Sequence, residues 1–143
     1  MRPWNPRDDE RGSASLEFIV AGLILLVPIV YLVLALGAVQ NAALGAEATA
    51  RFVARTIASG DEAAATVVRD SVAAGYGLDP ASLAIRVECV PAGAHCPAAG
   101  ATVLVTVSDT VSLPFMPDLF GLADATAIPV DATGTYRVER LTE

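Results

Sequence analysis

The sequence predicts a membrane-anchored α+β protein with a long N-terminal helix, a second short helix and a small antiparallel sheet of three to four strands. Two observations predict it: an uncharged apolar run from Phe18 to Val39, and three later segments in which apolar and polar residues alternate. The first is typical of a membrane helix and the second of strands with one buried face. We therefore divide the chain into a leader (residues 1–12), a long helix (13–59) and an α+β head (60–143).

The apolar run is long enough to cross a membrane. As a helix it would extend roughly 33 Å, about the thickness of the hydrocarbon core. We expect residues 18–39 to span the membrane, and we expect a helix kink at Pro28, which lacks a backbone N–H. A secretory signal peptide cleaved near Ala35-Leu36-Gly37 is the alternative, but its apolar core would normally hold about 7 to 15 residues.

Arginines flank the run on both sides. Before it stand Arg2, Arg7 and Arg11; well beyond it stand Arg51 and Arg55. Because positive residues near a span tend to stay in the cytoplasm, this favours a single-pass protein of the inner (cytoplasmic) membrane. Its N-terminus would be cytoplasmic and its C-terminal head extracytoplasmic.

Beyond Val39 the helix should continue as a more polar extension. Glu47 and Arg51 have the i,i+4 spacing of a helical ion pair. Small residues recur along one side, at Ala42, Ala46, Ala50, Ala54 and Ala58. Such a strip lets a partner helix approach closely, but alanine also favours helix by itself, and the sequence leaves both interpretations open.

The head should contain a helix packed on a sheet. Asp61 can cap a helix that runs to about Ala74, with Val68 and Val72 on one face. The three alternating segments carry apolar residues at Leu83, Ile85, Val87 and Cys89, at Val103, Val105 and Val107, and at Val130, Ala132, Tyr136 and Val138. An apolar loop at residues 114–122 would cover the core or offer a surface to another subunit.

Cys89 and Cys96 are the only cysteines. A disulfide between them would close a short turn-like loop, stabilise the head by roughly 2 to 3 kcal/mol and require an oxidising compartment. A metal site with His95, the only histidine, is the alternative, but three ligands leave the usual tetrahedral set incomplete. We expect the disulfide, no metal and no cofactor.

The charge and the motifs exclude several classes of function. The formal net charge is −7, and all of it falls after Gly12 because residues 1–12 hold equal numbers of acids and arginines. An acidic body with no basic patch argues against nucleic acid as a partner. No nucleophile elbow or phosphate-binding glycine loop is present, so we expect no enzyme.

One segment carries a family resemblance. The stretch Gly12-Ser13-Ala14-Ser15-Leu16-Glu17-Phe18 resembles the class III signal of type IV prepilins, and with the proline-containing apolar helix it is similar to TadE-like minor pilins (pseudopilins) of the Flp, or tight-adherence, pilus system. The resemblance implies that prepilin peptidase cuts after Gly12 and leaves Ser13 as the N-terminus. Read separately, Gly12 could be a linker glycine and Glu17 a first-turn acid favoured by the helix dipole.

The resemblance also implies a function. Glu17 would pair with the new N-terminal ammonium of a neighbouring subunit, and other pilins or pseudopilins of the Tad machinery would be partners through the N-terminal helix, in the membrane or in the pilus. The function expected is assembly of a Flp (Tad) type IVb pilus. The alternative is a signal-anchored or secreted extracytoplasmic binding module of the cell envelope.

Overall fold

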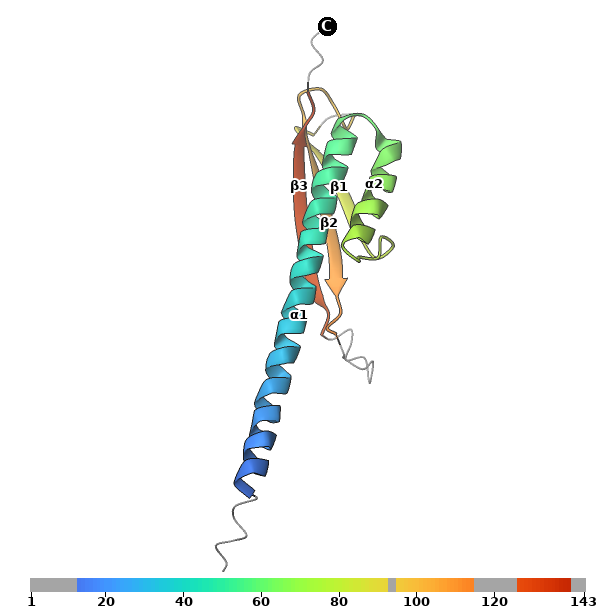
Figure 1. The fold of residues 1–143 in the computed structure, drawn as a ribbon. Coiled ribbons are helices and arrows are strands. Elements are labelled where there is room, and N and C mark those ends of the chain that lie inside the picture. Colours follow the sequence, from blue (N-terminus) through green and yellow to red (C-terminus); the bar gives the residue numbers. More distant parts are fainter. Residues whose placement is uncertain (1–12, 93–94, 115–125, 140–143) are drawn as a thin grey trace, which may run out of the picture. The chain divides into compact units, whose positions relative to one another are not determined.

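The computed structural model describes residues 13–92, 95–114 and 126–139. Its elements are helices α1 (Ser13–Ala58) and α2 (Glu62–Gly75) and strands β1 (Ala84–Val90), β2 (Thr102–Val111) and β3 (Ile128–Arg137). Figure 1 labels them and colours them in chain order, from blue to red. The predicted α+β layout, with a long apolar N-terminal helix, a short helix and a three-stranded antiparallel sheet, is confirmed.

The chain divides into two compact units, Met1–Leu36 and Gly37–Glu143. In the first, the described part is the apolar half of α1. Its large side chains are exposed, Phe18 at 81% and Val27 at 63% among them. A helix that is apolar all round buries nothing by itself and needs a membrane or an apolar partner around it.

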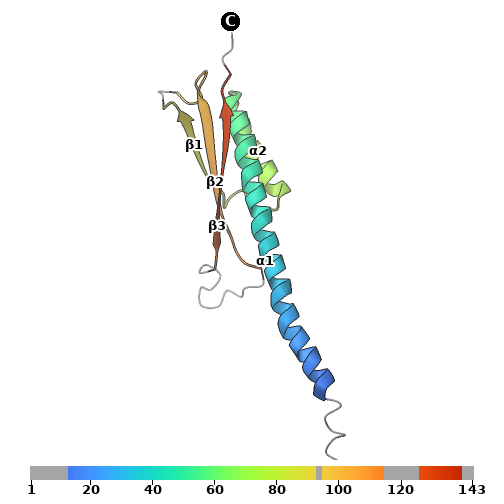
Figure 2. The ribbon, with the colours of Figure 1, turned by 90° about the vertical axis from the view of Figure 1, so that its left-hand side faces the viewer.

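The second unit is built on the sheet. The strand order is β1-β2-β3, with both pairs antiparallel and β2 in the centre. Within this unit, Figure 2 shows the sheet as one layer and the helices, α2 and the second half of α1, as the other. The predicted alternation is confirmed: Val103, Val105 and Val107 are fully buried, whereas their neighbours on β2 are only half-buried.

The alanine strip of α1 packs on this sheet. Ala46, Ala50 and Ala54 are fully buried in the same cluster as the β2 valines. At Gly134 the approach is closest: a Cβ there would lie 2.6 Å from the backbone nitrogen of Arg51 and closer still to the carbonyl of Ala50. The strip therefore serves the head's own sheet, and small side chains are needed there because helix and strand backbones nearly touch.

This packing places residues 37–58 in the same compact unit as the head, which we expected to begin at residue 60. The predicted ion pair between Arg51 and Glu47 is present on the exposed side of this segment. The sequence predicted that this segment is helical, but only the structure shows that its alanine strip contacts the sheet.

α2 begins at the predicted cap, and Val68 of its predicted face packs against the core cluster. Asp61 caps it by accepting a 3.0 Å hydrogen bond from the backbone nitrogen of Ala64, and Ala65 and Ala73 enter the core cluster. The chain after α2 crosses α1 at Gly45, where an added Cβ would lie 2.8 Å from Cβ of Tyr76. Asn41 secures this crossing by donating a 2.7 Å hydrogen bond to the carbonyl of Tyr76.

The other face of the sheet is polar. The register places Arg86 and Glu88 of β1 on this face, and they form a 2.8 Å ion pair. Thr106 and Thr133 lie opposite each other on β2 and β3 with their hydroxyls 3.2 Å apart. The sheet thus has one apolar face covered by helices and one polar face open to solvent.

Candidate functional site

The site predicted from the sequence lies at the start of α1. The helix begins at Ser13, and Glu17 follows four residues later on the same side of the helix. Gly12 and the rest of the predicted leader (1–12) lie outside the described residues. A helix that starts at Ser13 gives the residue expected to become the N-terminus a fixed position relative to Glu17.

Glu17 has an environment that suits a carboxylate poorly. Its side chain is exposed and has no hydrogen-bond or ion-pair partner within residues 13–92, 95–114 and 126–139. Exposed apolar side chains surround it in sequence, including Leu16, Phe18 and Val20. It is also the only charged residue between Arg11 and Glu47.

A carboxylate at the edge of such a surface is unfavourable in hydrocarbon unless it reaches the headgroups or a cation. Glu17 therefore marks a boundary: the side chains after it are suited to an apolar environment, and the carboxylate itself calls for a positive partner. The described residues of one chain provide none.

Pro28 lies inside α1, which runs through it without interruption. Because proline lacks a backbone N–H, the carbonyl one turn earlier has no helical donor there. The expected kink at this position stays a prediction.

Cys89 and Cys96 form a disulfide with a Cα–Cα distance of 5.9 Å. The bond ties the end of β1 to the β1–β2 connection. His95 is adjacent to Cys96, but both thiols are used in the disulfide and neither is a thiolate ligand for a metal. Among the residues that the structure describes, no three His, Cys, Asp or Glu side chains are grouped so that they could hold a metal ion.

No family model, curated protein or solved structure matches the chain. Its function must therefore be argued from its own residues. Among the described residues, one helix, α1, is long and apolar enough to cross a membrane, and it lies near the N-terminus. This is compatible with a single-pass membrane anchor.

A second candidate surface was not anticipated from the sequence. A groove of about 640 Å³ runs between α1 and β3, lined by Ala48, Arg51, Phe52, Arg55 and residues 133–136. A neighbouring hollow of about 610 Å³ continues it past Tyr136 to Arg137 and Glu139. Phe52 and Tyr136 remain exposed in this groove.

The groove joins two segments far apart in the sequence, so the periodicity of either segment alone does not reveal it. Two residues nevertheless indicate a close approach. Gly134 interrupts an otherwise regular strand, as glycine does where another backbone comes close, and Phe52 is a large apolar residue on the polar side of the helix.

Proposed function

We propose that this protein is a TadE-like minor pilin (pseudopilin) that takes part in assembly of a Flp (Tad) type IVb pilus and is not an enzyme. One observation carries the proposal: α1 begins at Ser13 and continues as an exposed apolar helix in which Glu17 is the only charge before Glu47. This arrangement provides an apolar surface for membrane or subunits and one acid that requires a cation.

In the proposed mechanism, prepilin peptidase cuts after Gly12 at the cytoplasmic side of the inner membrane. The cut creates an ammonium group on Ser13. As the apolar helices of neighbouring subunits pack together, Glu17 of one subunit pairs with this ammonium of the next. Pairing offsets the cost of burying either charge alone, and it sets the axial register of the helices.

A second candidate function has one observation in its favour. The compact unit Gly37–Glu143 begins at the last residue of Ala35-Leu36-Gly37, after which a signal peptidase could cut. The product would be an extracytoplasmic binding module of the cell envelope, signal-anchored if it is left uncut and secreted if it is cut.

The decisive experiment is N-terminal sequencing and intact-mass measurement of the membrane-extracted protein, from cells with and without active prepilin peptidase. We expect a peptidase-dependent start at Ser13. A start at Met1 or near Ala38 in both strains would reject the pilin proposal and support the binding module.

The same cells allow a test of Glu17. Glu17→Ala should leave membrane insertion unchanged yet impair pilus assembly, because the ammonium of the neighbouring subunit loses its partner. Ile19→Leu keeps the apolar surface and is the matched control. Normal piliation with Glu17→Ala would contradict the pairing mechanism.

A further inference from the structure

We propose that copies of this chain associate head to tail through their sheets, β1 of one copy adding to the edge of β3 of the next. The inference rests on the membrane anchor of the proposed function. It requires neither cleavage after Gly12 nor Glu17.

Within the described residues, both outer strands have backbone groups that no other strand pairs. Val138 uses both its groups toward β2: its N–H donates to Ala101 at 2.8 Å and its carbonyl accepts from Gly100 at 3.0 Å. By strand alternation, the N–H and C=O groups of residues 131, 133, 135 and 137 then point away from β2. Pro129 belongs to this outward set, and edge strands tolerate proline there because it has no N–H to leave unpaired.

The same alternation, carried through the β1–β2 register, directs the backbone groups of Ile85, Val87 and Cys89 away from β2. Within the described part of the chain, β1 and β3 are the two edges of the sheet. A strand that adds to either edge would satisfy these groups, as in β-augmentation.

The strand directions suit copies that share a membrane. β1 and β3 are both antiparallel to β2, so they run in the same direction. In every copy the head unit begins at Gly37, directly after the apolar run, so neighbouring heads turn the same end towards the membrane. β1 of one copy therefore meets β3 of the next as a parallel pair. Two β3 edges would not fit copies in one membrane. If both polar faces stay on the same side, the two edges can pair only antiparallel, and one head is then turned end over end. If the edges pair parallel, one polar face is turned to the other side.

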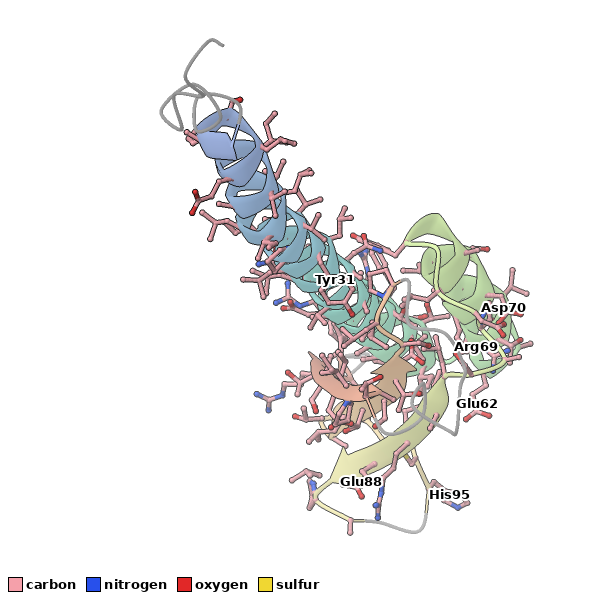
Figure 3. All side chains as sticks on the ribbon, turned by 90° about the horizontal axis from the view of Figure 1, so that it is seen from below. Tyr31, Glu62, Arg69, Asp70, Glu88 and His95 are labelled. Carbon is pink, nitrogen blue, oxygen red and sulfur yellow. A yellow bond between two sulfur atoms is a disulfide. The ribbon has the colours of Figure 1, made fainter. Side chains whose placement is uncertain are left out.

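The charges along the two edges are complementary in this arrangement. On the polar face β1 carries Arg86 and then Glu88, and Figure 3 shows Glu88 on the opposite side of β1 from α2. On the same face β3 carries Asp131 and, further along, Arg137, neither in an ion pair within the described residues. Along the common strand direction, β1 therefore carries a positive and then a negative side chain, whereas β3 carries a negative and then a positive one.

Copies at the same height would align Arg86 with Thr133 and Glu88 with Thr135, because these residues lie at equal levels of the sheet. Each charge is then diagonal to its opposite, Arg86 to Asp131 and Glu88 to Arg137. Such diagonal neighbours are one strand spacing of about 4.8 Å apart across the pair and two residues of about 3.3 Å each apart along it, a separation that long side chains can bridge.

The apolar face fits in the same register. Val87 belongs to the helix-covered face but remains 42% exposed, since it lies at the edge. In an aligned neighbour it would face Gly134, where the α1 backbone occupies the place of a side chain. The groove that Phe52 and Tyr136 help to line, beside this contact, would then receive the valine side chain. The contact joins two different edges, so it repeats from copy to copy and builds a ring or an open filament.

Cysteine crosslinking of the full-length protein in its own membrane tests the inference. Copies that carry Arg86→Cys and one tag are co-expressed with copies that carry Thr133→Cys and another tag, and the membranes are oxidised. We expect crosslinked heterodimers and none when either variant is expressed alone. No crosslink, or a crosslink between identical variants as strong as the mixed one, would overturn the proposal.

Charge reversal gives a second measurement on the same pair. Arg137→Glu on the Thr133→Cys copy should abolish the crosslink, because it places like charges next to Glu88. Glu88→Arg on the Arg86→Cys copy should restore it. A crosslink unaffected by Arg137→Glu would exclude the proposed register.

The two proposals fail separately. If the protein starts at Met1 both with and without active prepilin peptidase and the crosslink is present in both strains, the edge contact is supported and the pilin function is rejected. A peptidase-dependent start at Ser13 without a crosslink rejects the edge contact alone.

Discussion

The two halves of α1 are one continuous helix with opposite surfaces. Between Leu16 and Leu36 its large apolar side chains are exposed, whereas between Ala42 and Ala54 its buried residues are mostly alanines. Both halves are rich in apolar residues. The difference lies in size: large side chains cover the half that exposes an apolar surface, and small ones let the other half bring its backbone close to a strand.

Hydrophobicity alone therefore does not say which surface a helix residue contacts. Val27 is 63% exposed and Leu44 is 57% exposed, yet we expect the first in a membrane and the second in water. Ala50 is fully buried because Gly134 makes room for the backbone that carries it. The following three predictions test this contrast, beginning with the largest expected effect.

Gly134→Ala should destabilise the head most. The new Cβ would overlap backbone atoms of Ala50 and Arg51, which cannot move as a flexible side chain can. We expect a loss of about 3 kcal/mol or more, the upper end of the range for overpacking. Urea unfolding of the full chain in detergent, followed by circular dichroism, measures it.

Gly75→Ala is the matched control, because a Cβ at Gly75 meets nothing within 4 Å. Its stability should be unchanged or slightly higher, since alanine favours helix. Equal stability for Gly134→Ala and Gly75→Ala would show that helix and strand are not in close contact.

Val27→Arg should weaken membrane insertion. An arginine near the centre of a membrane helix costs about 2.5 kcal/mol or more on insertion scales. Leu44→Arg, at a similarly exposed position of the same helix, should insert normally because this position is expected outside the membrane. Extraction of membranes with alkaline carbonate measures the inserted fraction, and equal fractions for the two variants would contradict the boundary between the halves.

Thr49→Val should change the free energy of unfolding least of the three, and it should raise the stability of the head. Thr49 is fully buried on α1, and its hydroxyl has no hydrogen-bond partner within the described residues. Valine keeps the branched shape and removes the unsatisfied group. We expect a gain of about 1 kcal/mol in the urea experiment, and a loss of stability would show that the hydroxyl has a partner.

Local chemistry was sufficient to predict most of the elements. Asp61 predicted the start of α2, and the alternating valines predicted β2. Both predictions depend only on residues close in sequence, because a helix cap and the alternating faces of a strand are local features. The disulfide between Cys89 and Cys96 was also predicted, since only two cysteines are present and a short turn separates them.

The site was predicted in part. Ser13 and Glu17 were identified by the resemblance of residues 12–18 to a prepilin signal, and their roles stay predictions. The structure adds that one helix holds both and that exposed apolar side chains follow. The groove along β3 was missed. Phe52, Gly134 and Tyr136 acquire a common environment only when α1 lies against β3, and no periodicity within either segment records that contact.

The sequence by itself determined the apolar helix, its single acid, the cap of α2 and the alternation of the strands, because each depends on residues within a few positions of one another. Only the tertiary structure decided which side of α1 is covered, where two backbones nearly touch, and which charges lie along the sheet edges. These features depend on long-range packing, where the absence of a side chain at Gly134 matters as much as the presence of one elsewhere.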